Sequence, residues 1–186
     1  MESKRPRGRD EVVAAVLGAA ETLFAERGPS SVTLRDVAAA ADVNLGLLHR
    51  HIGSKEELLR AVLERMTNEG GGRLAERPDL RSSVDALMQP VPGIFNHVHL
   101  ISWLLLEGGD TGHGDPGFPG VEALVAKVAG PGDDGGARTT VLAMLSMIYG
   151  WQMFAPFLKE AAGVADLPEA DLVARLTELA VSLADR

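Results

Sequence analysis

The fold of this chain is decided by the stretch from Ser31 to Glu57, which reads S-V-T-L-R-D-V-A-A-A-A-D-V-N-L-G-L-L-H-R-H-I-G-S-K-E-E. It contains the signals for two short helices and a tight turn. Thr33 and Asp36 have the spacing of a capping box, and Asn44 is suited to cap a second helix. Asp42 falls where the chain must turn, and Asp tolerates a left-handed backbone better than most residues. The stretch therefore predicts helices over about 34–41 and 45–51.

Two short helices joined by a turn of a few residues are typical of the helix-turn-helix motif. The second helix of such a motif enters the major groove of DNA. Gly53 is placed to end this helix, and Ser54 to Glu57 has the spacing of a further capping box that opens the next helix. A first helix is expected over about 10–27, ending at Gly28. The sequence thus predicts a DNA-binding domain at the N-terminus.

Several short motifs follow one another along this region. They are Leu23-Phe24, Gly28, Val32-Thr33-Leu34, Val37-Ala38, Val43-Asn44-Leu45-Gly46 and His51-Ile52-Gly53-Ser54-Lys55-Glu56. In this order they resemble the N-terminal domain of TetR-family transcriptional regulators, over about the first third of the chain. The resemblance implies a bacterial regulator with a DNA-binding domain and a C-terminal helical domain that binds a small molecule and dimerises.

The sequence departs from the family's usual pattern at three positions. Asp42 stands at the turn, where the family usually has Gly. His49 stands where the family usually has Tyr, and Ile52 where it usually has Phe. The change at His49 affects an aromatic contact to the DNA backbone, although His can still donate a hydrogen bond to phosphate.

The net charge of −8 is unevenly distributed along the chain. Up to Met66 there are 10 Lys and Arg and 10 Asp and Glu, whereas the remainder has 8 basic and 16 acidic residues. A neutral N-terminal part with clustered Arg and an acidic remainder fits a protein that contacts DNA with one end only. The chain has no Cys, which excludes disulfides and suits a reducing compartment such as the bacterial cytoplasm, where a nucleoid-associated location is expected.

The N-terminus has the basic and apolar regions of a signal peptide, but an amphipathic helical stripe runs past any cleavage site. No membrane span and no membrane partner are expected.

Residues 1–9 form a basic arm, and its Pro6-Arg7-Gly8-Arg9 core resembles an AT-hook. Arg is favoured in a narrow, A·T-rich minor groove. The expected minor-groove residues are Lys4, Arg5, Arg7 and Arg9, and the alternative is a solubilising tail with weak phosphate contacts.

The rest of the chain reads as all-helical. A fourth helix is expected to begin after Ser54 and to stop at Gly70-Gly71-Gly72. The predicted domains are the arm (1–9), a helix-turn-helix domain with the linking helix (10–69), and an effector-binding and dimerisation domain (70–186). In the last of these, helices are expected over about 80–88, 93–107, 121–129, 137–162 and 166–185. A kink or break is expected at Pro156, because proline cannot bond back to Gln152.

The candidate DNA contacts are of two kinds, contacts to the bases and contacts to the DNA backbone. Arg35 has the side chain for a bidentate bond to guanine, and its alternative role is a surface salt bridge. Leu45 and Leu47 would meet thymine methyl groups unless one of them is core, as Leu48 is expected to be. By the family resemblance, Thr33, His49, His51 and Lys55 contact the DNA backbone. The full predicted set is Thr33, Arg35, Asn44, Leu45, Leu47, His49, Arg50, His51 and Lys55.

Aromatic residues and Met are concentrated in the C-terminal domain. Such side chains line adaptable apolar pockets, but they also fill ordinary cores. The family resemblance favours a pocket for a mostly apolar effector. The candidate lining residues are Phe95, His99, Trp103, Met144, Met147, Tyr149 and Trp151. A homodimer is expected through the helices over about 137–162 and 166–185, which would form a four-helix interface. The candidate dimer residues in the last helix have a 4, 3, 4 spacing that suits helix packing, and they are Leu172, Leu176, Leu179 and Leu183.

Other chemistry has little support in the sequence. His97 and His99 lie on different faces of a helix, and His113 could meet them only through folding, so no metal site is expected. The G-x-G-x-x-G match at 112–117 follows no strand, and Pro116 interrupts it. We find no nucleophile elbow or paired carboxylates, and we expect no cofactor and no enzymatic activity.

The function predicted is a homodimeric, ligand-responsive repressor of a palindromic double-stranded DNA operator. The alternatives are an activator, a ligand-independent DNA-binding protein, or a small-molecule carrier or enzyme.

Overall fold

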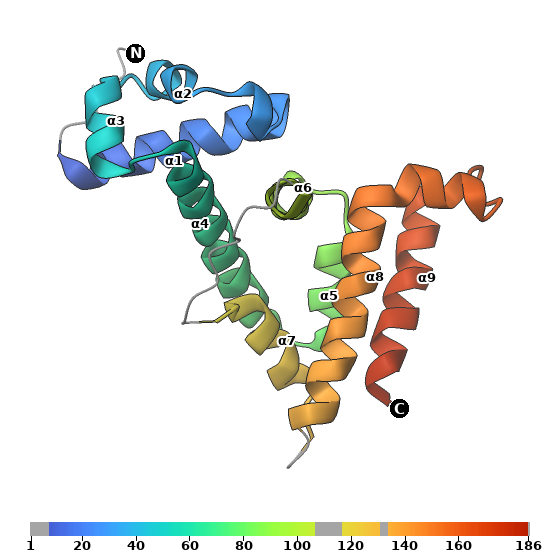
Figure 1. Cartoon of the computed structure of the whole chain (residues 1–186). Helices are drawn as coiled ribbons and strands as arrows, with labels where there is room; N and C mark the ends of the chain where they lie inside the picture. Colours follow the sequence, from blue (N-terminus) through green and yellow to red (C-terminus); the bar gives the residue numbers. More distant parts are fainter. Residues whose placement is uncertain (1–7, 107–116, 131–133, 186) are drawn as a thin grey trace. The chain divides into compact units, whose positions relative to one another are not determined.

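The structure, a computed structural model, describes residues 8–106, 117–130 and 134–185, and within these ranges every regular element is a helix (Figure 1). The expectation of an all-α protein is confirmed. The chain divides into two compact units. We call the first the head, which holds the described residues up to Met66 and the part of α6 from His99 onward. We call the rest the body.

The head begins with α1 (Arg9–Arg27), a short 3-10 turn η1 (Pro29–Ser31), α2 (Leu34–Ala40) and α3 (Leu45–His51). The first half of α4 (Lys55–Ala75) completes the sequence-local part of the head. These bounds agree with those predicted for the first three helices. The helices form because apolar residues recur at helical spacing, and their buried faces meet in one cluster. Fully buried members of that cluster include Val16, Val37, Leu48, Leu58 and Val62.

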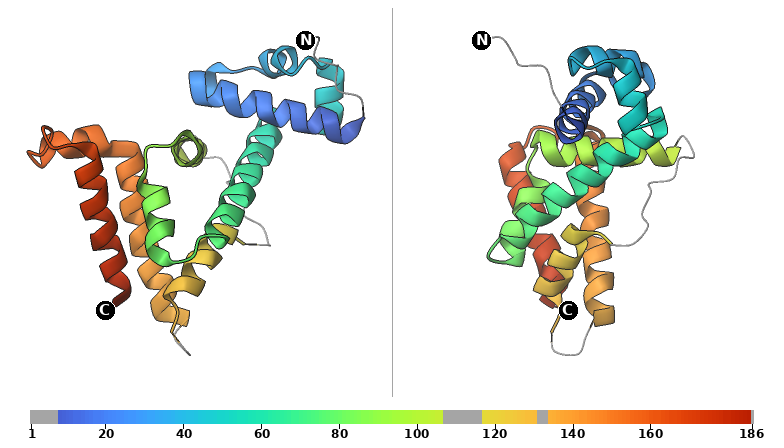
Figure 2. Two further views of the ribbon diagram at one scale, coloured as in Figure 1. Left: turned by 180° about the vertical axis from the view of Figure 1, so that it is seen from behind. Right: turned by 90° about the vertical axis from the view of Figure 1, so that its left-hand side faces the viewer.

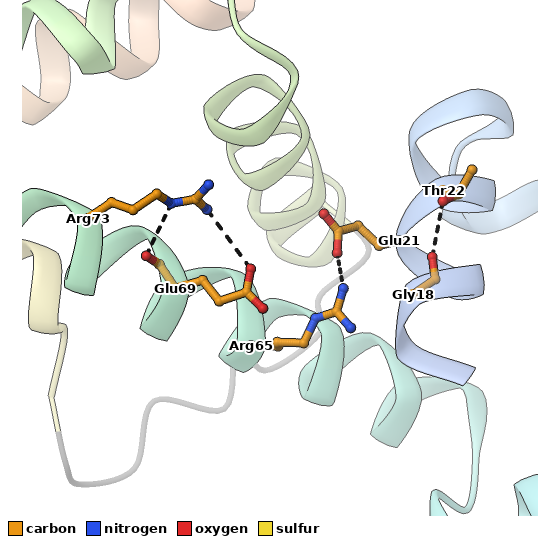
Figure 3. A network of polar contacts seen from close by, with 6 residues as sticks. All are labelled: Gly18, Glu21, Thr22, Arg65, Glu69 and Arg73. Atoms are coloured by element: carbon orange, nitrogen blue, oxygen red, sulfur yellow. Dashed lines mark hydrogen bonds and ion pairs between the residues drawn. The ribbon is translucent and has the colours of Figure 1, made fainter. Parts of the chain in front are cut away.

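Two features of the head join residues far apart in the sequence. Leu100 and Leu104 of α6 (Pro92–Leu106) are buried in the same apolar cluster as α1 to α4. That whole helix was expected in the C-terminal domain, but the structure places its second half in the head. An ion pair also joins Arg65 of α4 to Glu21 of α1 (Figure 3).

The fourth helix does not stop at the three glycines, so that expectation is wrong. α4 runs to Ala75, and Arg73 beyond the glycines donates a hydrogen bond to the carbonyl oxygen of Glu69 over 3.2 Å (Figure 3). Gly71 is buried, and a Cβ atom there would lie 2.6 Å from Cβ of Pro119 and 2.8 Å from the backbone nitrogen of Gly120. The glycine therefore permits close packing of α4 against α7 (Pro119–Val128), and this contact compensates for the low helix propensity of Gly.

The body contains the second half of α4, α5 (Leu80–Met88), the start of α6, α7, α8 (Asp134–Ala161), α9 (Glu169–Ser182) and the 3-10 turn η2 (Leu183–Asp185). α5, α8 and α9 lie side by side in both views (Figures 1 and 2). Their buried faces meet in a cluster that includes Val84, Met88, Met144, Ile148 and Trp151. A second cluster joins α7 to the start of α8 through Leu124, Val125, Ala137 and Val141.

Polar side chains reinforce these contacts at helix ends. The ammonium of Lys127 donates to the carbonyl of Leu74 over 3.0 Å, which ties α7 to the end of α4. Arg138 of α8 donates two hydrogen bonds, 2.9 and 3.0 Å long, to the carboxylate of Glu122. The buried amide of Gln152 donates to the carbonyls of Leu87 and Gln89 over 2.7 and 3.1 Å. Gln152 thus satisfies the C-terminal end of α5, which has no helical partner of its own.

α8 is long, apolar and bent in its later part (Figures 1 and 2). Pro156 lies inside the helix and lacks the N–H that would bond to the carbonyl of Gln152, which accounts for a bend there. No membrane span was expected from the sequence, but by length and composition alone Gly135–Ala161 could cross a membrane. The core helix of a folded protein can pass the same test.

Candidate nucleic-acid interface

The first helix of the motif, α2, is held at its start by a complete capping box. The backbone N–H and the hydroxyl of Thr33 donate to a carboxylate oxygen of Asp36 over 2.8 and 2.6 Å, and the N–H of Asp36 donates back to the Thr33 hydroxyl over 3.2 Å. These bonds from Thr33 hold the pKa of the Asp36 carboxyl below its usual value. The prediction of a cap is confirmed.

The box also limits what Thr33 offers to DNA. Its hydroxyl hydrogen and its N–H are both engaged by Asp36. A phosphate oxygen can only accept hydrogen bonds, so it finds no donor on Thr33 while the box is closed. Thr33 therefore contributes by fixing the start of α2.

The turn between α2 and α3 has the geometry expected from its sequence. Asp42 has φ 50°, the left-handed conformation, and it is the only non-glycine residue with positive φ among those the structure describes. The side chain of Asn44 then accepts a 2.7 Å hydrogen bond from the N–H of Gly46 and caps α3. Since Asn44 uses its oxygen for the cap, its amide nitrogen is the group that can donate to a base.

The side chains of α3 divide into a buried and an exposed face. Leu48 is fully buried in the head core, as expected. Leu45 is half-buried and packs against that core, whereas Leu47 is 38% exposed. His49 and Arg50 are exposed and His51 is half-buried. Leu47 is therefore the leucine better placed to contact a thymine methyl group.

Two arginines of the motif have no ion-pair partner in the described part of the chain. Arg35 and Arg50 are exposed, and neither forms an ion pair with any residue that the structure describes. The surface salt bridge that was considered as an alternative role for Arg35 is therefore absent among the described residues. Both guanidinium groups retain their full set of donors, so they are available for guanine or phosphate.

Lys55 and His49 make contacts within the head that the sequence did not reveal. The ammonium of Lys55 donates to the carbonyl of Ser30 over 3.4 Å, which leaves two further donors for phosphate. A ring nitrogen of His49 lies 3.2 Å from the carbonyl oxygen of Gly53, in the turn between α3 and α4. The capping box predicted for α4 is present, because Ser54 and Glu57 exchange hydrogen bonds of 2.7 and 3.2 Å.

The N-terminal arm is only partly described. Lys4, Arg5 and Arg7 lie outside the described residues, and so does His113. Arg9 is exposed in the first turn of α1. The proposed minor-groove contact of the arm stays a prediction.

The candidate pocket residues fall into different surroundings. Met144 and Trp151 are buried in the body core, and Met147 and Tyr149 pack at its edge. Burial raises the pKa of the Tyr149 hydroxyl. Phe95 is 42% exposed, His99 is exposed, and Trp103 packs against the head core. The structure therefore brings four of the seven together, all from α8, and the pocket stays a prediction.

The candidate dimer leucines lie along α9. Leu172, Leu176 and Leu183 are half-buried and pack against the body core, whereas Leu179 is 57% exposed. A larger apolar surface lies on α8, where Leu142, Phe154 and Phe157 are 65, 55 and 68% exposed. The sequence signal for this surface is the absence of any charged residue between Arg138 and Lys159.

With this geometry in view, comparisons with known proteins identify the family. Residues 16–62, which span the helix-turn-helix, match the bacterial regulatory proteins of the tetR family. The chain is 38% identical over 165 residues to the HTH-type transcriptional repressor Rv3405c of Mycobacterium tuberculosis, covering 88% of this chain and 84% of that protein. The chain belongs to the TetR family. It is accordingly a DNA-binding transcriptional regulator and not an enzyme, and it acts in the cytoplasm, where bacterial DNA lies.

Solved structures of other proteins share the fold. The TetR regulator SCO7222 of Streptomyces coelicolor matches with a TM-score of 0.68 and 18% identity, covering 97% of this chain and 99% of that one. The multidrug binding protein EbrR, solved with imidazole, matches with a TM-score of 0.60 and 21% identity, covering 91 and 88% of the two chains. At these identities the likeness concerns the fold.

Proposed function

We propose that this TetR-family protein is a homodimeric repressor that binds a palindromic operator and is released by a mostly apolar small molecule. The observation that carries the proposal is the capped helix-turn-helix with two exposed arginines, Arg35 and Arg50, which form no ion pair with the residues that the structure describes. The Mycobacterium tuberculosis relative Rv3405c is named as a transcriptional repressor. The protein would be nucleoid-associated while it is bound to its operator.

The expected pairing surface is the uncharged face of α8 together with Leu179 of α9. Several large apolar side chains that are exposed on one protein indicate a contact site, and a second copy is the occupant that a two-fold operator requires. Only 28% of the most apolar stretch of α8 is buried by its own chain. Dimerisation would bury the rest and place two copies of α3 roughly one or more DNA turns apart, about 34–36 Å or a multiple.

The effector is expected to bind among the aromatic and Met side chains of α8. Met144, Met147, Tyr149 and Trp151 supply a surface without charge, and adaptable Met side chains suit varied apolar ligands. The structural neighbour EbrR is described as a multidrug binding protein. Release of DNA requires that the ligand bind the DNA-free arrangement of the dimer more tightly than the DNA-bound one.

The first test is selection of bound duplexes from a random DNA library with the purified protein. The expected result is a palindrome with fixed half-site spacing. Arg35→Ala should lose enrichment at one symmetrical pair of positions, and Arg77→Ala, which removes an exposed positive charge from the body, should leave the motif intact. Binding without any motif would contradict sequence-specific regulation.

The second test concerns assembly and release. Leu142→Asp should convert the dimer to monomers in sedimentation, whereas Val91→Asp, a control at another exposed apolar residue of the body, should not. A dimer that survives Leu142→Asp would place the interface elsewhere. Screening apolar small molecules against the protein–operator complex should find compounds that lower DNA affinity. Compounds that only raise it would favour an activator or co-repressor mechanism.

A further inference from the structure

The ring of His49 is held in one hydrogen-bonding state by the turn that follows α3. One ring nitrogen lies 3.2 Å from the carbonyl oxygen of Gly53. A carbonyl oxygen can only accept, so this nitrogen must carry the hydrogen. A neutral imidazole has a single N–H. The other nitrogen of neutral His49 therefore presents a lone pair to the solvent.

The acceptor for this bond is fixed by the turn itself. Gly53 has φ +105°, and its N–H donates to the carbonyl of Leu48 over 3.3 Å. The next residue, Ser54, is held by the capping box with Glu57. Because the backbone is bound on both sides of the Gly53 carbonyl, that oxygen stays in place and keeps the N–H of His49 engaged.

A lone pair on the outer nitrogen is the wrong group for a phosphate, whose oxygens also only accept hydrogen bonds. The imidazolium has a second N–H and a positive charge, and both favour phosphate. We propose that His49 binds an operator phosphate only as the imidazolium, so that DNA binding takes up a proton at this residue. The proposal rests on the proposed function, in which the exposed face of α3 meets DNA.

The charges around α3 do not supply an alternative partner. The hydrogen bond to Gly53 is the only interaction of the His49 ring with the residues that the structure describes. Other ionisable groups stand on α3 itself, on the neighbouring helices α1 and α2, on the part of α4 that belongs to the head, and on the turn before α3. They are Arg9, Asp10, Glu11, Glu21, Glu26, Arg27, Arg35, Asp36, Asp42, Arg50, His51, Lys55, Glu56, Glu57, Arg60, Glu64 and Arg65. Carboxylates, Lys and Arg ordinarily change charge outside the range in which His does, so His51 is the neighbour that the test must separate.

The proposal predicts the direction in which operator affinity changes with pH and the largest change that is possible. Because each of the two subunits on a palindromic operator holds one more proton at His49, affinity for the operator must rise as pH falls, by at most about tenfold per pH unit for each subunit and about a hundredfold for the dimer. The additional phosphate contact also releases about 0.9 more counterions for each subunit, so the dependence of affinity on salt should be steeper at low pH.

The experiment is a fluorescence-anisotropy titration of the full-length protein with operator duplex from about pH 8 to about pH 6, at constant ionic strength. The wild-type protein and His51→Gln should both gain affinity as pH falls. His49→Gln should bind weakly with a flat profile. His49→Arg, whose side chain stays charged, should keep the low-pH affinity at about pH 8. Thermal melts of each variant by circular dichroism verify that the head remains folded.

The possible failures can be told apart. A flat wild-type profile, or a profile unchanged by His49→Gln, overturns the proton-linked contact while leaving the proposed function intact. Affinity that rises with pH would mean that the lone pair of neutral His49 accepts a hydrogen bond from a base, which also overturns the proposal. If no duplex binds at any pH, both the contact and the proposed function are wrong.

Discussion

Where α4 approaches α7 closely, two adjacent glycines of α4 differ in the space available for a side chain. At Gly71 an added Cβ would lie 2.6 Å from Cβ of Pro119 and 2.8 Å from the nitrogen of Gly120. At Gly72 an added Cβ would meet nothing within 4 Å. Gly71→Ala and Gly72→Ala are therefore a matched pair, because they share the gain in helix propensity and differ only in the contact.

The magnitudes follow from the atoms involved. Replacing Gly by Ala inside a helix stabilises it by about 0.8–1.0 kcal/mol. Overpacking costs about 1–3 kcal/mol, and the upper half of that range is expected here because the obstructing atoms belong to a proline ring and to backbone. Gly72→Ala should therefore stabilise the protein by about 1 kcal/mol. Gly71→Ala should destabilise it by about 1–2 kcal/mol once its propensity gain is subtracted.

The assay is urea unfolding of both variants and the wild type, followed by far-ultraviolet circular dichroism. All three must be compared at one protein concentration, since self-association adds stability by mass action. Melting temperatures should move by roughly 2–4 °C for each kcal/mol. If Gly71→Ala stabilises the protein as much as Gly72→Ala does, the packing of α4 on α7 is not as close as described and the explanation for the glycine is wrong.

Three further predictions concern other contacts. Gln152→Leu should destabilise the body by about 1–3 kcal/mol in urea unfolding, because the carbonyls of Leu87 and Gln89 lose their donor, and an unchanged midpoint would contradict this. Arg35→Ala should weaken operator binding by about 1–3 kcal/mol and random DNA much less, and equal losses on both would rule out base contact. Hydrogen bonds from Ser82 hold the pKa of the Asp79 carboxyl at the start of α5 below its usual value, so the stability it provides is present above the unfolded-state pKa and lost as pH falls through the folded-state pKa. Asp79→Asn, which keeps a capping oxygen, should flatten the acid limb of a plot of melting temperature against pH below about pH 4.

The helix-turn-helix could be predicted closely because its signals are local. Thr33 with Asp36, Asn44 with Gly46, and Ser54 with Glu57 each form hydrogen bonds within three residues of chain. Asp42 adopts the left-handed conformation that its position required. Such signals depend on sequence spacing alone, so no knowledge of the rest of the fold was needed.

The features that were missed depend on partners far away in the chain. Gly70-Gly71-Gly72 read as a helix end, because the packing of Gly71 on Pro119 is visible only in three dimensions. Leu100 and Leu104 read as part of the C-terminal domain, yet they complete the head core. The bond between Lys55 and Ser30 spans 25 residues and carries no sequence signature. The DNA contacts, the pocket and the dimer residues remain predictions.

The uncharged face of α8 has a genetic consequence if two chains pair through it. A subunit with an intact α8 and α9 but a disabled α3 would still be taken into dimers. Each mixed dimer would bind one half-site of the operator and would lose the binding free energy of the second half-site. In a cell that makes both forms, loss-of-function changes on the exposed face of α3 should therefore be dominant, whereas changes that prevent pairing at Leu142 should be recessive.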